Sequence, residues 1–197
     1  MKYDITIIGA GPAGLSFARS LANTSLNVVM IEKLPRAVLC DPAFDGRDIA
    51  LTHKSVKILR ELGVWPRIPA DSIHPIKEAR VLDGASPYFL NFDSENDCVE
   101  ALGYIVSNHH IRKALFDEVT TFPNIDIIAD TSVASVTTST NEASVVLSDD
   151  RTIESSLIAA ADSRFSETRR MMGISASMRD FGRTAIVCRM EHEKPHN

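Results

Sequence analysis

The sequence is poor in the features that mark secreted, membrane-spanning and nucleic-acid-binding proteins. Only three of its 197 residues are cysteines, and Cys40, Cys98 and Cys188 are too widely spaced for a metal-binding or disulfide pattern, which indicates reduced thiols. Lys and Arg (21) are outnumbered by Asp and Glu (26), so no basic face for nucleic acid is expected. No apolar run is long enough to cross a bilayer. The first residues, MKYDITII, match neither a signal nor a transit peptide, so a cytoplasmic protein is expected.

What the sequence does contain is a β-α-β pattern at its start. Residues 3–8 (YDITII) predict a short buried strand, because they are apolar and β-branched. The apolar spacing that follows predicts a helix from about Pro12 to Asn23, and residues 27–31 (NVVMI) predict a second buried strand. Strands joined in this way lie parallel in the interior of a sheet.

Three glycines stand between the first strand and the helix. Gly9 would permit the tight turn, Gly11 would let a diphosphate approach the backbone, and Gly14 would allow the helix to pack closely on the strand. The N-terminal end of the helix attracts phosphate charge. Glu32 ends the second strand, where its carboxylate can accept hydrogen bonds from ribose hydroxyls and would repel a 2′-phosphate. The pattern predicts a site for FAD or NAD rather than NADP; the alternative is a glycine-rich turn beside a surface glutamate.

The middle of the chain predicts two helices and a hairpin. A helix is expected from Thr52 to a stop at Gly63, and another from about Asn108 to Thr121. Residues 79–83 and 88–92 read as the two strands of a β-hairpin.

The last third is dominated by short β segments. Residues 157–160 (LIAA) predict a buried strand that ends at Asp162, residues 164–172 a polar helix, and residues 184–190 a strand without an evident partner. Four short β segments precede the strand at 157–160 and are separated by turn-forming residues. They predict a meander packed across the main sheet, and they are residues 125–129, 132–138, 143–148 and 152–154.

Several stretches, in order along the chain, resemble the FAD-dependent aromatic hydroxylases of the p-hydroxybenzoate hydroxylase superfamily, and most closely the ubiquinone-biosynthesis hydroxylases. They include GAGPAG with VVMIEK, GRDIALTHKSVKILRELGVW and YIVSNHHIRKAL. LIAAADSRFSETRRMMGI and MEHEKPHN continue the resemblance almost to the end.

The resemblance implies an α/β, Rossmann-like FAD/NAD(P)-binding fold. Its central parallel sheet would carry helices on one side and the β-meander on the other. Residues 1–165 would form the FAD-binding domain, with a hairpin excursion near 74–103 that belongs to the substrate side. Residues 166–197 would begin a truncated substrate-binding domain.

The resemblance also implies a chemistry and a set of cofactor contacts. NAD(P)H would reduce FAD, and the reduced flavin would use O2 to hydroxylate an aromatic small molecule. A polyprenyl phenol as substrate would imply contact with a membrane surface, peripheral to the inner membrane, or with a biosynthetic complex. No catalytic side chain is assigned, and the cofactor contacts implied are Gly9, Gly11, Pro12, Ala13, Gly14, Glu32, Lys33, Arg47, Asn108, Arg112, Val133 and Asp162. From the residues alone, Arg47 and Arg112 could equally be solvated arginines, and Asn108 could be the N-cap of its helix.

Two departures from the family pattern bear on activity. The family's Asp-Gly pair is Asp162–Ser163 here, so serine must adopt a conformation that glycine adopts easily. The family's downstream Gly-Asp motif is absent, as is most of the substrate domain. We therefore expect a truncated chain that holds FAD weakly or not at all and does not hydroxylate alone.

Other functions remain open from the sequence. One is a different FAD oxidoreductase of the same fold, such as a reductase or a halogenase, and another is a non-catalytic nucleotide-binding remnant. No metal is expected, because His109 and His110 have no carboxylate or cysteine at helical spacing on their face.

Overall fold

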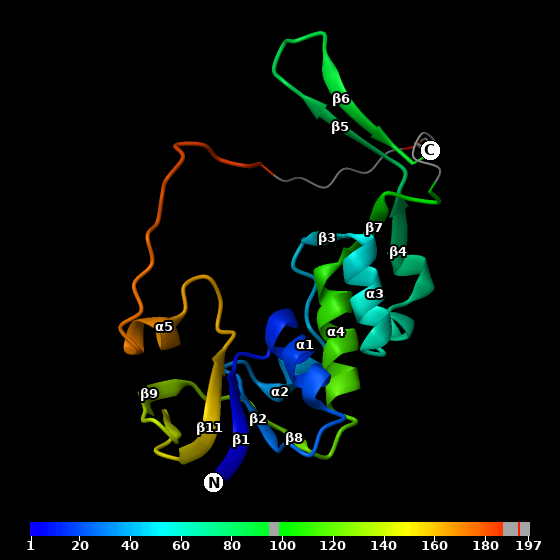
Figure 1. Cartoon of the computed structure of the whole chain (residues 1–197). Helices are drawn as coiled ribbons and strands as arrows, with labels where there is room; N and C mark the ends of the chain where they lie inside the picture. The colour runs from blue at the N-terminus through cyan, green and yellow to red at the C-terminus, as the bar shows by residue number, and fades with distance from the viewer. Residues whose placement is uncertain (95–98, 187–192, 194–197) are drawn as a thin grey trace.

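A six-stranded sheet forms the centre of the protein in its computed structural model, which describes residues 1–94, 99–186 and 193. The strand order is β8-β2-β1-β11-β10-β9. The first four strands in this order run parallel, and β10 and β9 extend the sheet antiparallel (Figure 1). The strands are β1 (Lys2–Ile8), β2 (Val28–Ile31), β8 (Ile125–Ile128), β9 (Val133–Thr138), β10 (Ala143–Leu147) and β11 (Thr152–Ala160).

Helices cover one face of this sheet. The helices α1 (Pro12–Leu21) and α4 (Asn108–Val119) pack against each other, and both begin toward the same end of the molecule (Figure 1). Apolar residues of both helices form one core with Ile5 and Ile7 of β1. The shorter α2 (Arg36–Cys40) packs on α4. The helix α3 (His53–Glu61) begins after its cap Thr52 and ends before Gly63, which has a φ of +72°, as predicted.

The meander covers the other face. Val145 and Leu147 of β10 and Ile153 of β11 form a second buried cluster with Val29 and Ile31 of β2. This confirms the predicted arrangement of helices on one side and meander on the other.

Two predictions about the β segments were wrong. Residues 125–129 do not belong to the meander, because β8 pairs in parallel with β2 at the edge of the main sheet. Residues 152–154 and 157–160 are not separate strands but parts of the continuous β11, which pairs with β1 along most of its length. The polar residues Glu154 to Ser156 interrupt the apolar pattern without interrupting the strand.

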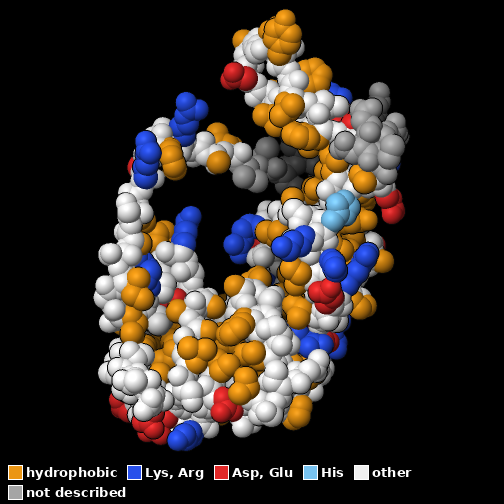
Figure 2. All heavy atoms as spheres, viewed as in Figure 1, with side chains coloured by type: hydrophobic (Ala, Val, Ile, Leu, Met, Phe, Trp, Pro, Cys, Tyr) orange, Lys and Arg blue, Asp and Glu red, His pale blue; other side chains and the backbone are white. Residues whose placement is uncertain are grey.

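A smaller sheet and a hairpin lie beyond the helices. The three-stranded sheet β3-β7-β4, which the sequence did not predict, consists of β3 (Asp48–Leu51), β7 (Gly103–Ser107) and β4 (Ile73–Ile76). The predicted hairpin is present as β5 (Glu78–Leu82) and β6 (Phe89–Asp93), and it projects from the body (Figure 1). Hydrophobic side chains gather on it in Figure 2, and the exposed ones include Leu82, Tyr88, Phe89 and Leu90. The division of the chain into domains stays a prediction.

The segment after β11 contains less regular structure than predicted. The helix α5 covers only Glu167–Met171, and short 3-10 turns occur earlier at Trp65–Arg67 and Ala70–Ser72. Residues 184–186 are not in a strand, and the rest of the strand predicted at 184–190 lies outside the described residues. The same holds for all but Glu193 of the MEHEKPHN stretch. No helix in the described ranges is long and apolar enough to cross a membrane.

Candidate functional site

The turn between β1 and α1 is built on close backbone contacts that only glycine permits. Gly9 has a φ of +104°, and a Cβ at this position would lie 2.5 Å from the carbonyl oxygen of Ala161. A Cβ on Gly14 would overlap the carbonyl oxygen of Gly9. Gly11 differs, because a Cβ there would meet no atom of the described chain within 4 Å. Gly9 and Gly14 are therefore needed by the fold, while Gly11 leaves open space at the start of α1.

Glu32 stands beside this turn. Its carboxylate Oε2 accepts a hydrogen bond from the N–H of Ala10 at 2.7 Å, and Oε1 accepts one from Leu34 at 3.0 Å. The residue is buried, with 9% of its surface exposed. Each carboxylate oxygen can accept a second hydrogen bond, so the side chain can still bind ribose hydroxyls.

Most of the residues implied as cofactor contacts line one cavity of about 590 Å³. The cavity lies at the carboxyl ends of β1, β2 and β11, where open parallel sheets bind their ligands. Residues that the sequence did not single out, Thr131, Ser132 and Thr168 among them, complete its wall. The implied contacts brought together there are Gly9, Gly11, Pro12, Ala13, Glu32, Lys33, Val133 and Asp162.

Asp162 lines this cavity and has a partly satisfied carboxylate. Its Oδ2 accepts hydrogen bonds from the N–H and the hydroxyl of Thr168, both at 3.0 Å. Its Oδ1 is buried and has no partner in the described part of the chain. Burial raises the pKa of Asp162, but the donors on Ser166 and Thr168 outweigh it, so the net pKa lies below its ordinary value. The carboxyl group is therefore an ionised acceptor that lacks one donor.

The residue after Asp162 carries backbone strain. Ser163 has a φ of +100°, a region that side chains other than glycine adopt at a cost. This is the position where the family pattern has glycine.

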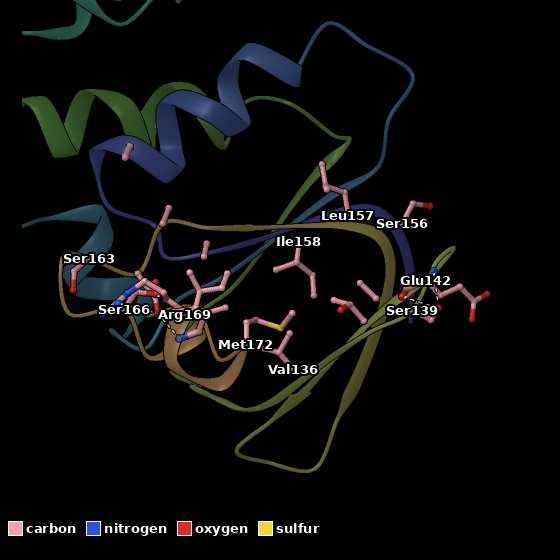
Figure 3. A pocket seen from close by; sticks show the side chains of 18 of the residues that line it. Val136, Ser139, Glu142, Ser156, Leu157, Ile158, Ser163, Ser166, Arg169 and Met172 are labelled. Carbon is pink, nitrogen blue, oxygen red and sulfur yellow. Dashed lines mark hydrogen bonds between the residues drawn. The ribbon is translucent and has the colours of Figure 1, made fainter. Parts of the chain in front are cut away.

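A second cavity, of about 850 Å³, adjoins the first and shares Ala13, Asp162 and Ser163 with it. In Figure 3, Met172, the residue after α5, lies beside Val136 of β9, with Arg169 of α5 close by.

Four implied cofactor contacts line neither cavity: Gly14, which packs on Gly9, and Arg47, Asn108 and Arg112. Asn108 is the first residue of α4 rather than its N-cap, which is Ser107. The Asn108 amide donates a hydrogen bond to Asp45 at 2.8 Å, and Arg47 forms an ion pair with the same carboxylate. Hydrogen bonds from Arg47 lower the pKa of Asp45 to about 2. Burial raises this pKa by a smaller amount, and the hydrogen bond from Asn108 lowers it further. Arg112 is half-buried one turn further along α4. Asp45 was missed by the sequence analysis, although the Asp-Gly-Arg sequence was a signal for a structured turn.

These features fit the adenosine and diphosphate end of FAD. The open space at Gly11 can admit a diphosphate, Glu32 can bind a ribose, and Asp162 Oδ1 lacks a donor of the kind that sugar hydroxyls supply. Among the described residues, no three His, Cys, Asp or Glu side chains converge as a metal site would need.

Comparison with known protein families supports this assignment. Residues 2–194 match the model of a family described as an FAD binding domain. The chain belongs to this family. The family assigns FAD to this chain, and which residues hold it stays a prediction that the geometry of the cavity fits.

Two characterised relatives of this FAD-binding domain are ubiquinone hydroxylases. UbiM of Neisseria meningitidis is 48% identical over 196 residues, which is 98% of this chain and 42% of that protein. UbiL of Rhodospirillum rubrum is 31% identical over 193 residues, again 98% of this chain and 44% of that protein. The chain thus spans less than half the length of these two relatives.

Solved structures show the same fold for this FAD-binding domain. PqsL of Pseudomonas aeruginosa, described as a probable FAD-dependent monooxygenase, aligns with a TM-score of 0.72 and 18% identity over 92% of this chain and 48% of that one. The p-nitrophenol 4-monooxygenase PnpA of Pseudomonas putida aligns with a TM-score of 0.72 and 16% identity over 87% of this chain and 44% of that one. At these identities the likeness shows the fold alone.

Proposed function

We propose that this chain is the cofactor-holding part of an FAD-dependent monooxygenase that hydroxylates an aromatic ubiquinone precursor and uses NAD(P)H as reductant. The support for the substrate class is that UbiM and UbiL are ubiquinone hydroxylases. The observation that carries the cofactor assignment is the glycine turn with Glu32 at its side. The full activity is proposed for a protein of the relatives' length, because the chain spans less than half of either.

The implied cofactor contacts that line the cavity of about 590 Å³ have proposed tasks in holding the cofactor. The backbone from Gly9 to Gly14 binds the diphosphate, since the free N–H groups at the start of α1 carry partial positive charge. Glu32 accepts hydrogen bonds from the adenosine ribose, with Lys33 beside it. Val133 offers backbone groups to the adenine, and Asp162 accepts a hydrogen bond through its unpartnered Oδ1.

Arg47, Asn108 and Arg112 are proposed to act at the far end of the diphosphate and the ribityl chain. The support is that Asn108 and Arg112 lie at the start of α4 and that the Asn108 N–H bonds the carbonyl oxygen of Arg47. The start of α4 lies toward the same end of the molecule as the start of α1 (Figure 1). When bound, FAD supplies the redox chemistry and the reaction with O2. The chain's own residues hold and orient it.

A polyprenyl substrate would bring the longer protein to a membrane surface or to other proteins of the same biosynthesis. The exposed apolar side chains of the β5–β6 hairpin support contact of that kind.

By themselves, the 197 residues are proposed to bind FAD weakly and not to hydroxylate. The strained Ser163 and the lack of a Gly-Asp motif support this statement. The experiment is a fluorescence titration of FAD with the chain and with the variant Glu32→Gln; the control is Glu154→Gln, an exposed position on β11. We expect saturable FAD binding that weakens about tenfold in Glu32→Gln and is unchanged in the control. Equal binding by all three proteins would contradict the assignment, and flavin that copurifies at a near-equal molar ratio would contradict weak binding.

A further inference from the structure

A short turn before β3 joins two of the proposed cofactor contacts through a residue with no assigned role. In the sequence Asp45-Gly46-Arg47, the N–H of Arg47 donates to Asp45 Oδ1 at 3.2 Å. The Arg47 side chain donates to Asp45 Oδ2 from Nε at 2.9 Å and from Nη2 at 2.5 Å. Gly46 has a φ of +72°, which lets the chain reverse so that the two side chains meet.

The same carboxylate reaches across to α4. Asn108, which is buried, donates from Nδ2 to Asp45 Oδ2 at 2.8 Å. The Asn108 backbone N–H donates to the carbonyl oxygen of Arg47, also at 2.8 Å. Asp45 therefore holds the guanidinium of Arg47 and the amide of Asn108 in one arrangement at the beginning of the helix.

The geometry leaves part of Arg47 available to a ligand. Asp45 engages the Nε and Nη2 edge, so Nη1 and its two N–H groups are not used by this carboxylate. The Arg47 side chain is 66% exposed, while that of Asp45 is 25% exposed. A long exposed arginine samples many rotamers unless a partner restrains it.

We propose that Asp45, anchored by the Asn108 amide, is a positioning residue for FAD that orients Arg47 toward the diphosphate and ribityl chain. This inference rests on the proposed function. A purely structural role is a poor explanation of the Asp45–Arg47 ion pair, because an ion pair on an exposed arginine adds little to folding stability. The low pKa of Asp45 agrees with a carboxylate that stays ionised and engaged at any working pH.

The test is a double-mutant cycle on FAD affinity. FAD is titrated into the wild-type chain and into Asp45→Ala, Arg47→Ala and the double variant. Asp41→Ala, an exposed aspartate of the same loop, is the matched control. We expect Asp45→Ala and Arg47→Ala each to weaken binding about tenfold, and the double variant to be no weaker than Arg47→Ala alone. The melting temperature of unliganded Arg47→Ala is expected to stay close to that of the wild type, whereas that of Asp45→Ala is expected to fall, because the buried Asn108 amide loses its acceptor. The titrations are therefore run at a temperature where all variants are folded.

Every other outcome contradicts either the positioning role of Asp45 or the proposed binding of FAD. If the wild type binds FAD and Asp45→Ala binds equally well, the positioning role falls and the proposed function stands. Additive losses in the double variant would show that Asp45 acts independently of Arg47, and tighter binding by Asp45→Ala would show that it competes with the diphosphate; both overturn the inference. If the wild type does not bind FAD, the cofactor proposal fails and the inference fails with it.

Discussion

The carbonyl oxygen of Gly9 occupies the space that a side chain on Gly14 would need. The two glycines thus fix how closely the first turn of α1 approaches the end of β1. Gly11, between them in the sequence, makes no comparable contact with the described chain. The motif therefore combines two positions that the fold requires with one that leaves room for a ligand.

Gly14→Ala is expected to destabilise the protein by about 3 kcal/mol or more, because the added methyl group would overlap backbone rather than a movable side chain. Urea unfolding followed by circular dichroism measures the change. Gly11→Ala is the matched control and should unfold like the wild type, since Gly11 has an ordinary φ of -74° and open space around it. Similar stability of the two variants would contradict the packing described for Gly14.

Ser163→Gly is expected to raise the free energy of unfolding by about 1 kcal/mol, because glycine adopts the φ of +100° without strain. The gain is reduced by the greater freedom of glycine in the unfolded chain. Ser156→Gly, within β11, serves as control and should lower stability by about 0.5–1 kcal/mol. A loss of stability in Ser163→Gly would show that the serine is not strained.

Glu118 on α4 joins three elements through two arginines. Its Oε1 accepts from Arg19 of α1 and its Oε2 from Arg67, both at 2.7 Å, and Glu118 itself is 7% exposed. Glu118→Ala is expected to cost about 3 kcal/mol of unfolding free energy, since it leaves the nearly buried charge of Arg19 unpaired. Asp117→Ala, which removes an exposed ion pair with Lys113, should cost about 0.5 kcal/mol. If thermal or urea unfolding showed the same loss of unfolding free energy in Glu118→Ala and Asp117→Ala, burial would not explain the contribution of the Glu118 ion pairs.

Stability should depend on pH through Asp162. Its pKa in the folded chain is lowered, so the ionised group stabilises the fold above the unfolded pKa of about 3.9 and loses this contribution as the pH falls below that value. The stability difference between wild type and Asp162→Asn should therefore be largest near neutral pH and shrink toward pH 3. Urea unfolding over this range measures it, and a difference that grows on acidification would contradict the lowered pKa.

The parts of the fold that the sequence predicted are those set by short-range patterns. β1, α1 and β2 follow from apolar spacing and a glycine turn within some thirty residues. The edge strand β8 was assigned to the wrong layer, because its parallel pairing with β2 joins segments far apart in the chain. β11 was predicted as two strands, since Glu154 to Ser156 are polar although they pair within the sheet.

The residues of the candidate site also differ in whether short-range sequence patterns could identify them. Residues next to the glycine turn, such as Gly11 and Glu32, were identified from local sequence, and the chain brings Asp162 to the same cavity through the pairing of β1 with β11. Asp45 could not be identified, because its partner Asn108 lies in a helix that a long stretch of chain separates from it.

The central claim is that the backbone between β1 and α1 binds the diphosphate of FAD. The most direct test compares FAD titrations of the wild type and Gly11→Ala, with unfolding curves to show that both are folded. We predict at least a tenfold loss of affinity in Gly11→Ala at unchanged stability, because the methyl group enters only the space left for the ligand. Equal affinities of the two folded proteins would show that the diphosphate does not bind at this turn.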